Sequence, residues 1–419
     1  MDKIRLSIVG CGGMGHRHLK GLGELDRQGL SRFELVAACD PNRSNAESLA
    51  DDAEALLGSR PEVVTDLDQL ESVGVDAIDV PTTPRFHHSI ATDALARGWH
   101  CMIEKPVGLT VKACNLIVAA SQAGQVVSVA ENYRRDPMNR LAKALIEAKV
   151  IGDPRLLIHH AMGGGGNNMV ISVWRHQKNQ SGVLLDVGVH FTDMMEYLLG
   201  EITTVYAQTR LHEKIRYNPA ARGEASRSNP SGVYEKWQRE MPAEFEATAE
   251  DASYATLTFA NGVVGQYIED HAIHGTGGWL RQIQGSNGSM NLPPDRKGAP
   301  MSVNVAGKVY EGDDVLDLVP DFRLDEATAK LYGGERLGSY ALEFPEIDRK
   351  VLATEYADFG DAIANGYAPE VDIHQGTRSV AIVYAMMESG ASGEIVQVED
   401  VISEKVDAYQ AEINVDLGL

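Results

Sequence analysis

The sequence predicts two domains: an α/β domain with a doubly wound parallel sheet, then an α+β domain with an open, mostly antiparallel sheet. Strand and helix patterns alternate up to about residue 130, and a glycine-rich turn joins the first strand to the first helix. Farther on, short strands separated by hairpin signals such as Asn261-Gly262 replace that alternation. The predicted boundaries are 1–135 and 136–419, within the two or three domains that 419 residues allow.

The first domain is predicted from apolar runs that alternate with amphipathic segments. Because parallel strands place their carboxyl ends at one edge of a sheet, polar residues that follow the strands are expected to meet there. The predicted strands are 4–9, 33–39, 63–65, 76–80, 100–103 and 126–129, and the predicted helices or helical turns are 45–57, 67–72, 88–97 and 112–123.

The second domain is predicted from weaker patterns. The stretch 183–199 combines a strand-like start with a helix, and helices at about 350–393 are expected to pack back near the first domain. Segments 211–250 and 295–345 lack a clear period, and the first is interpreted as a long insert, a lid or an oligomer arm. The other predicted elements are helices 138–149, 355–365 and 377–390 and strands 156–162, 205–211, 252–259, 263–268, 282–284 and 289–292.

The most informative motif is Gly10-Cys11-Gly12-Gly13-Met14-Gly15, between the first strand and the first helix. Gly10 permits a tight turn, Gly12 lets the backbone approach a pyrophosphate, and Gly15 lets helix and strand pack closely. Asp40 ends the second strand, where a carboxylate accepts hydrogen bonds from ribose hydroxyls and repels a 2′-phosphate. The motif therefore predicts NAD binding, with NADP left open by the nearby Arg43.

Composition narrows the class of protein. The formal net charge of -22 makes nucleic acid an unlikely class of partner, because it repels phosphate backbones. No apolar run approaches the ~18 residues of a membrane span, and the N-terminus enters a strand without a signal-peptide pattern. The four cysteines form no C-x-x-C pair, so buried free thiols in a reducing compartment are predicted. We expect a cytoplasmic protein that does not bind membranes.

Lys105 is the first candidate for chemistry. It lies in Glu104-Lys105-Pro106 at a strand end on the expected cofactor edge. A partly desolvated lysine there can hold a substrate hydroxyl and ease its deprotonation. Pro106 restricts the chain after it and is a candidate for a cis peptide bond. The alternative is a solvated lysine at a strand end.

Asp186 and His190 are the second candidate. Their i, i+4 spacing places both on one face of a helix, and histidine titrates near neutrality, which suits general acid–base work. The same spacing can bind a metal ion, but no third ligand stands at suitable spacing, and no metal is predicted. A structural pair at a helix start is the other alternative.

Further side chains are candidates for substrate contacts. Trp174 can stack on a sugar face and Arg175 can clamp a hydroxyl-rich or anionic substrate, unless both only pack at the rim. His271, after a predicted strand, is a candidate for the same site, with an ordinary loop histidine as the alternative. The glycines 163–166 are interpreted as a flexible loop.

Together these motifs resemble the Gfo/Idh/MocA family, the glucose-fructose oxidoreductase and inositol dehydrogenase group. The resemblance covers most of the chain except 211–250 and 295–345, and the closing stretch 355–393 resembles the family's last helices. The segments that carry it are Gly10–Gly15 with His18, Cys39-Asp40-Pro41, Thr82-Thr83-Pro84 with His87, Glu104-Lys105-Pro106, Asn132-Tyr133-Arg134-Arg135, Trp174-Arg175, 182–190 and Asp193.

The resemblance implies a Rossmann domain, an open sheet domain, and a pocket of Lys105, Asp186 and His190 beside the nicotinamide. His190 would be the acid/base, Lys105 would polarise the reacting group, and Asp186 would position the sugar. A homodimer or homotetramer through the C-terminal sheet is also implied. The implied cofactor contacts are Gly10, Gly12, Gly13, Met14, Gly15, Asp40, Arg43, Thr82, Thr83, His87, Glu104, Lys105 and Asn132. The implied substrate contacts are Lys105, Arg134, Trp174, Arg175, Asp186, His190 and His271.

Three functions remain open from the sequence. The first is an NAD-dependent oxidoreductase acting on a secondary alcohol of a cyclic sugar, polyol or glycoside. The second is a glycoside hydrolase that holds NAD tightly through oxidation, elimination and reduction. The third is a non-catalytic NAD-binding regulator, which would have no need of Lys105, Asp186 and His190 together.

Overall fold

The computed structural model describes residues 3–223 and 230–419. The chain divides into two compact units, and the chain crosses between them more than once. The first unit comprises 1–132 and 345–377, and the second comprises 133–344 and 378–419. Part of the predicted insert 211–250, residues 224–229, lies outside the described residues.

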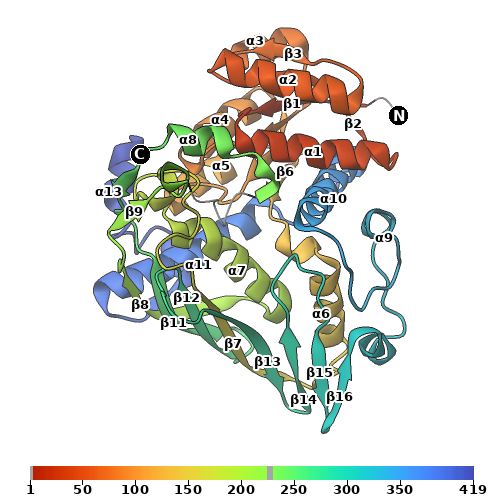
Figure 1. Ribbon diagram of the computed structural model, residues 1–419, viewed down its shortest axis with the longest axis vertical. Helices are drawn as coiled ribbons and strands as arrows, with labels where there is room; N and C mark the ends of the chain where they lie inside the picture. The colour runs from red at the N-terminus through yellow and green to blue at the C-terminus, as the bar shows by residue number, and fades with distance from the viewer. Residues whose placement is uncertain (1–2, 224–229) are drawn as a thin grey trace. The chain divides into compact units, whose positions relative to one another are not determined.

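Within its described residues the first unit holds a six-stranded parallel sheet, with strand order β3-β2-β1-β4-β5-β6. Its first strands and helices, from β1 to α3, are drawn in red and orange in Figure 1. The order reverses between β1 and β4, and in such sheets ligands bind outside the carboxyl ends of the strands at that reversal. The predicted strands and helices are confirmed to within a few residues. The elements are β1 Ile4–Val9, α1 Gly13–Arg27, β2 Phe33–Cys39, α2 Arg43–Leu57, β3 Glu62–Val64, α3 Leu67–Val73, β4 Ala77–Val80, α4 Pro84–Ala96, β5 His100–Glu104, α5 Val111–Ala120 and β6 Val127–Ala130.

Helix α10, Phe344–Asn365, brings a distant part of the chain into the first unit. Its Phe359 ring stacks on Phe33 of β2 at 5.7 Å between centroids. A Cβ at Gly21 of α1 would lie 2.5 Å from Leu352 Cβ, so glycine permits α1 and α10 to approach closely. The core of the nucleotide unit therefore depends on residues more than 300 positions apart.

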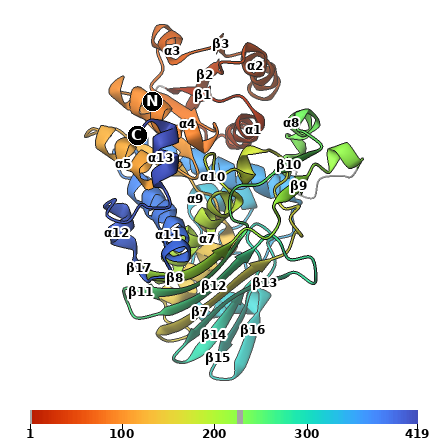
Figure 2. The ribbon, with the colours of Figure 1, turned by 90° about the vertical axis from the view of Figure 1, so that its left-hand side faces the viewer.

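The described residues of the second unit form a nine-stranded mixed sheet, the large sheet, ordered β16-β15-β14-β13-β7-β12-β11-β8-β17. Only the pair β12 and β7 is parallel among these described strands, as the prediction of a mostly antiparallel sheet requires. Helices α7 and α11 lie on one side of it (Figure 2). The elements are α6 Pro137–Glu147, β7 Pro154–Met162, α7 Val183–Leu199, β8 Ile202–Arg210, β11 Ala252–Phe259, β12 Val264–Asp270, β13 Gly278–Gly285, β14 Gly288–Leu292, β15 Ser302–Val305, β16 Lys308–Glu311, α11 Ile373–Ser392 and β17 Val396–Gln397.

Aromatic packing holds α7 on the large sheet. Phe191 of α7 lies 4.6 Å from the His159 ring of β7, 5.8 Å from Trp279 of β13 and 6.5 Å from Tyr267 of β12, between centroids. Burial lowers the pKa of His159 well below its usual value, with Arg281 as the next cause, so the ring packs as a neutral aromatic group. This packing fixes the rotation of α7 on the large sheet, and with it the direction of the candidate residues Asp186 and His190 on the same helix.

The structure corrects two predicted elements and adds several. Helix α10 begins at Phe344 and not at the predicted position 355. The stretch 183–199 is helix α7 from its first residue, so the predicted strand-like start is wrong. The first turn is buried on all sides, and its sequence therefore shows no helical period. The segments 211–250 and 295–345, which lack a hydrophobic period, contain helices and strands that are too short to show a period. Those are β9 Ile215–Tyr217, α8 Glu235–Glu240, β10 Glu244–Glu246, β15, β16 and α9 Glu326–Tyr332, and the C-terminus adds β17, α12 Val398–Ile402 and α13 Ala411–Leu417.

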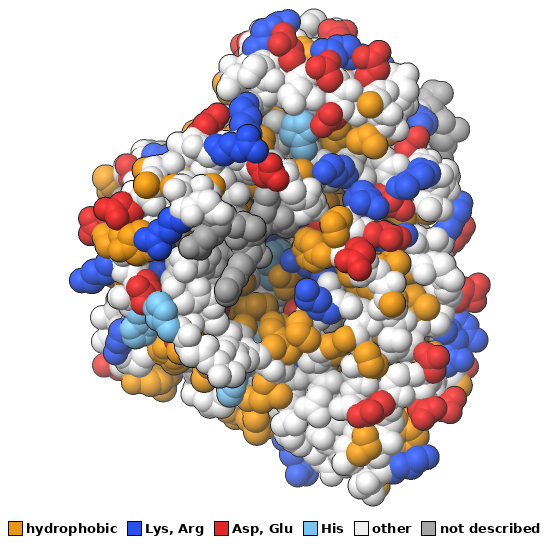
Figure 3. Space-filling view, in the orientation of Figure 1, with side chains coloured by type: hydrophobic (Ala, Val, Ile, Leu, Met, Phe, Trp, Pro, Cys, Tyr) orange, Lys and Arg blue, Asp and Glu red, His pale blue; other side chains and the backbone are white. Residues whose placement is uncertain are grey.

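The cysteines are free and buried, as predicted: Cys11, Cys39, Cys101 and Cys114. Burial, with Asp40 as the next cause, raises the pKa of the Cys39 thiol to about 12, so the nucleophilic thiolate is suppressed. On the face drawn in Figure 3, Lys and Arg side chains lie among Asp and Glu side chains rather than apart from them. Helices of the described residues are too short or too polar to span a bilayer.

Candidate active site

The glycine-rich turn lies at the carboxyl end of β1, where the strand order reverses. Gly10 has φ +109°, and a Cβ there would lie 2.6 Å from Thr82 Cγ2. A Cβ at Gly15 would lie 2.3 Å from the Gly10 carbonyl oxygen. A side chain at Gly10 would push the turn away from Thr82, and one at Gly15 would push α1 away from the turn, so both glycines are needed for this close packing of strand, turn and helix.

Asp40 is tied to the same turn. Its Oδ2 accepts from Cys11 N at 2.9 Å and its Oδ1 from Asn42 N at 2.8 Å, which fixes the carboxylate at the end of β2. Arg43, which left NADP open, pairs through Nε with Glu47 at 2.9 Å on the exposed surface of α2. The Asp40 carboxylate is therefore held at the turn, whereas the Arg43 guanidinium is paired with Glu47. A carboxylate at this position favours ribose hydroxyls over a 2′-phosphate.

His87 joins the ends of β4 and β5. The fully buried ring lies with Nδ1 2.9 Å from the Pro106 carbonyl oxygen and Nε2 3.1 Å from the Thr82 carbonyl oxygen. Burial lowers the pKa of His87, so the ring is neutral and donates one proton to one of the two carbonyls. The Lys105–Pro106 peptide bond is cis, which confirms Pro106 as the candidate for a cis bond.

Glu104 presents buried acceptor atoms at the end of β5. It is 2% exposed, and both carboxylate oxygens have no hydrogen-bond partner among the described residues. Burial raises the pKa of Glu104, but His18, Lys105 and Arg17 outweigh burial and lower it, so the group is a carboxylate. Buried acceptors without hydrogen bonds are rare, and these two lie at the sheet edge where a dinucleotide would bind, which is compatible with the predicted NAD site.

A second layer holds Glu104, and sequence reasoning missed most of it. His18 of α1 lies with Nδ1 2.9 Å from Asp79 Oδ2 and Nε2 3.6 Å from Glu104 Oε1, and Tyr356 of α10 donates to Asp79 at 2.6 Å. Burial lowers the pKa of His18, but Asp79 and then Glu104 outweigh burial and hold it well above its usual value. The available signal was Asp79 itself, a carboxylate inside a buried strand, which requires a partner.

The other predicted cofactor contacts of the first unit lie at element starts and ends. Gly12 caps α1, which begins Gly13-Met14-Gly15, and Thr83 caps α4. Asn132 follows β6, is 2% exposed, and has no partner for its buried Oδ1 among the described residues.

In the second unit, Asp186 lies in the first turn of α7 and His190 one turn later. Both are buried, at 2% and 6% exposure. Arg175 donates from Nε to Asp186 Oδ2 at 3.0 Å and from Nη1 to Ser172 at 2.8 Å. Its guanidinium also lies 4.0 Å from the Trp174 ring centroid. The predicted clamp Arg175 thus pairs with the predicted sugar-positioning carboxylate.

Gly188, between Asp186 and His190, has a packing role that the sequence did not reveal. A Cβ there would lie 3.0 Å from Glu269 Oε2 and 3.2 Å from Val383 Cγ2. Tyr267 donates to the same Glu269 carboxylate. Glycine therefore lets α7 rest against a buried acidic group of β12, which sets how deeply the helix start lies on the large sheet.

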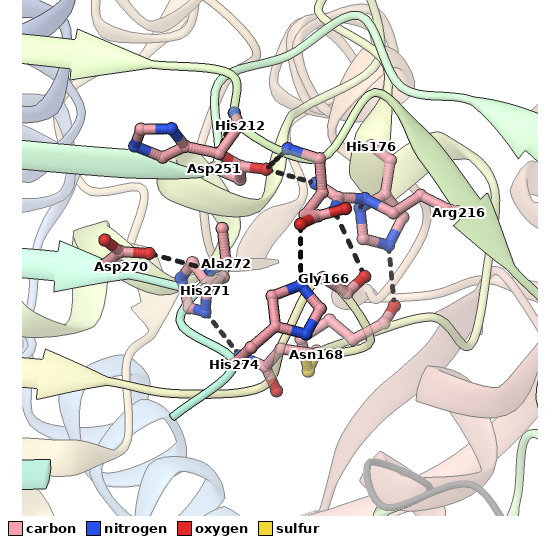
Figure 4. A network of polar contacts seen from close by, with 12 residues as sticks. Gly166, Asn168, His176, His212, Arg216, Asp251, Asp270, His271, Ala272 and His274 are labelled. Carbon is pink, nitrogen blue, oxygen red and sulfur yellow. Dashed lines mark hydrogen bonds and ion pairs between the residues drawn. The ribbon is translucent and has the colours of Figure 1, made fainter. Parts of the chain in front are cut away.

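His271 belongs to a polar network at the end of β12 (Figure 4). Asn168 lies 2.6 Å from its Nδ1, and its Nε2 lies 2.7 Å from Glu269 Oε1, so both ring nitrogens are engaged.

Nearby, buried Arg216 donates to Asp251 at 3.0 Å and to the Gly166 carbonyl at 3.2 Å. Burial, then Arg216, lowers the pKa of His176 to about 3. Gly165 and Gly166 also donate to the Ile273 and His271 carbonyls, so hydrogen bonds fix the glycine loop.

Arg134 is the remaining predicted substrate contact of the second unit. It donates from Nε to Asp193 Oδ2 at 2.9 Å, and its guanidinium lies 5.0 Å from the Tyr197 ring centroid. Each of these predicted residues therefore has a fixed position in its own unit. In residues 3–223 and 230–419, no cluster of three or more His, Cys, Asp and Glu side chains forms a candidate metal site.

The strand order and the glycine turn define a dinucleotide-binding protein. Residues 4–131 match the oxidoreductase family model for the NAD-binding Rossmann fold, and residues 143–398 match that family's C-terminal alpha/beta domain. The chain belongs to the Gfo/Idh/MocA oxidoreductase family, and its first unit is an NAD-binding Rossmann domain.

Several characterised proteins are similar to it. Levoglucosan dehydrogenase of Pseudarthrobacter phenanthrenivorans is 26% identical over 421 residues, 96% of this chain and 100% of that protein. The scyllo-inositol 2-dehydrogenase (NAD(+)) of Bacillus subtilis is 27% identical over 252 residues, 55% of this chain and 69% of that protein.

Solved structures share the fold. A levoglucosan dehydrogenase complex with NADH has a TM-score of 0.73 at 21% identity, covering 94% of this chain and 99% of that one. An Agrobacterium radiobacter oxidoreductase in complex with NAD+, L-tartaric acid and magnesium has a TM-score of 0.71 at 19% identity, covering 95% and 99%.

Proposed function

We propose that this chain is an NAD-dependent dehydrogenase that oxidises a secondary alcohol of an uncharged cyclic sugar, polyol or glycoside. The observation that carries the proposal is helix α7, which holds a buried carboxylate and a buried imidazole one turn apart in a chain whose other unit binds NAD. The full-length similarity to levoglucosan dehydrogenase supports a carbohydrate substrate.

The proposed roles follow from the chemistry of each side chain. His190 takes the hydroxyl proton, because imidazole is a base near neutral pH. Lys105 polarises the reacting oxygen and stabilises the negative charge that forms on it. Asp186, fixed by Arg175, accepts hydrogen bonds from sugar hydroxyls and orients the ring. NAD, when bound, accepts the hydride that leaves the carbinol carbon.

An uncharged substrate is supported by the pairing of buried arginines. Recognition of a phosphate or a carboxylate usually depends on Arg or Lys that the anion itself can neutralise. Among the described residues of the second unit, carboxylates already accept from four of the buried arginines. The pairs are Arg134 with Asp193, Arg175 with Asp186, Arg216 with Asp251 and Arg281 with Asp295.

The test is a substrate panel with purified protein and NAD. It comprises levoglucosan, scyllo-inositol, glucose, glucose 6-phosphate and nitrophenyl glycosides, followed for both NADH and nitrophenol. We expect NADH to accumulate with one or more uncharged substrates. The rate of NADH formation should be lower with glucose 6-phosphate. Nitrophenol release without net NADH would contradict the proposal and support the hydrolase alternative, which is less favoured because the relatives named above are dehydrogenases.

Replacing Asp40 with serine tests the cofactor preference. We expect the ratio of kcat/KM for NAD over NADP to fall by about tenfold or more, since a charge-assisted hydrogen bond contributes roughly 1.5–3 kcal/mol. Steady-state kinetics with both cofactors measures this ratio. Asp51→Ser, an exposed change on α2, is the matched control, and an unchanged ratio for Asp40→Ser would show that Asp40 does not select NAD.

We also propose that the outer face of the large sheet binds a second copy of this chain, as a dimer or tetramer. One uncharged row crosses six neighbouring strands on that face, and its side chains are exposed or half-buried. Interface cores are depleted in charge, which fits this composition. The row runs in register through Thr256, Gln266, Ile158, Gln282, Asn291 and Ser302.

A charge in the middle of this row is expected to separate the subunits. Gln282→Arg should lower the molar mass in solution to that of one chain, because the partner would have to bury the charge. Light scattering after gel filtration measures the mass, with Glu62→Lys, a change at an exposed position of β3, as the control. A monomeric wild type would contradict the proposal.

A further inference from the structure

We infer that Tyr133 is a positioning residue for His190, and that Arg296 in turn holds the Tyr133 ring in place. Arg296 lies in the segment 295–345, which the sequence left unassigned. The inference rests on the proposed function, because it assigns Tyr133 a task in the step that His190 performs. All three residues lie in the second unit.

The rings of Tyr133 and His190 are stacked. Their centroids lie 4.0 Å apart and their planes differ by 2°. A parallel stack uses the face of the imidazole, while both ring nitrogens lie at its edge, in the ring plane. Tyr133 therefore fixes the plane of His190 without occupying the nitrogen that must exchange a proton.

Tyr133 is itself fixed through its backbone. It begins the 3-10 helix Tyr133–Arg135, directly before α6. Asn139 of α6 donates from Nδ2 to the Tyr133 carbonyl oxygen and to Asp295 Oδ1, each at 2.8 Å. One amide group thus joins the backbone of the stacking residue to residue 295.

Arg296 reaches the Tyr133 ring from that point. Its Cζ lies 4.7 Å from the ring centroid, and its Nη2 lies 3.3 Å from Tyr133 Oη. Its backbone N donates to Asp136 Oδ2 at 2.8 Å, and Tyr340 donates to the same oxygen at 2.9 Å. The segment 295–345 therefore carries the residue that confines the phenol ring beneath His190.

The stack also matches the chemistry of the step. The face of a phenol ring attracts a cation more strongly than a neutral ring. Contact between the two rings therefore strengthens as His190 takes up the hydroxyl proton. An interaction that is stronger after proton transfer than before it contributes to rate rather than to substrate binding.

The test compares Tyr133→Leu, which removes the flat ring, with Tyr133→Phe, which keeps it. For Tyr133→Leu we expect kcat to fall by up to about 10²-fold, the loss that a displacement of about 1 Å can cause. The sugar KM and the NAD dissociation constant should change little, and the solvent deuterium isotope effect on kcat should rise. Tyr133→Phe should restore most of the rate. Equal losses in both variants, or an unchanged rate in Tyr133→Leu, would overturn the inference.

A readout independent of activity separates this inference from the proposed function. Ring currents should shift the His190 ring-proton resonances upfield in wild type and Tyr133→Phe but not in Tyr133→Leu, with His190→Gln providing the assignment. If the shift is present while the wild type oxidises no sugar, the proposed function fails and the stack stands. Absence of the shift in the wild type overturns the inference whatever the activity.

Discussion

Replacing Lys105 with alanine is expected to lower kcat by about 10²–10⁴-fold, the contribution typical of a positioned group in acid–base chemistry. NAD should still bind, because the glycine turn and Asp40 hold their geometry without this side chain. Steady-state kinetics on the best sugar of the panel and fluorescence titration with NADH measure the two effects separately.

Two controls define the Lys105 result. Lys308→Ala removes an exposed ammonium from β16 and should leave kcat unchanged. Thermal unfolding checks that Lys105→Ala is folded, since Lys105 helps to lower the pKa of the buried Glu104 carboxylate. A folded Lys105→Ala variant that keeps its turnover would show that the catalytic role of Lys105 is wrongly assigned.

The second large effect is expected on stability. Arg175→Met leaves the Asp186 carboxylate buried at 2% exposure without the guanidinium that pairs with it. Breaking a buried pair in this way costs roughly 3–5 kcal/mol, because the remaining charge stays desolvated after its ion-pair partner is removed. Urea unfolding, which gives the free energy of unfolding, measures the loss.

A double mutant distinguishes a stranded charge from lost packing. Arg175→Met with Asp186→Leu should recover much of the free energy of unfolding, because no buried charge is left unpaired. The surface pair of Arg43 and Glu47 is the matched control, and Arg43→Met should cost about 0–1 kcal/mol. If Arg175→Met cost no more stability than the control Arg43→Met, that result would contradict a buried, fixed ion pair.

The fold of the first unit could be predicted almost completely from the sequence. Its strands are short apolar runs, each followed by a turn signal, and local patterns of that kind are readable without tertiary contacts. The second unit was harder because its insertions fold into elements of three to seven residues, too short for a period to develop. The start of α7 was misread because complete burial removes the polar face that marks a helix.

The sequence names candidate site residues, but it does not give the partners that hold them. Asp186, His190 and Arg175 each stand in a recognisable motif, yet the ion pair between Arg175 and Asp186 depends on where a loop meets a helix start. The same holds for His87, whose position between two carbonyls follows from the pairing of β4 and β5. Spacing along the chain cannot give such distances.

The sequence by itself determined the dinucleotide-binding unit and its cofactor NAD, and it supplied the candidates proposed for hydride-transfer chemistry. Those features depend on local needs: a turn without side chains, a carboxylate after a strand, an acid and a base one helical turn apart. Only the tertiary structure decided what holds each group, from Asp79 and Tyr356 behind Glu104 to Tyr133 beneath His190. Burial makes those partners necessary, and they come from segments up to hundreds of residues away because a folded core brings together whatever the chain topology makes adjacent.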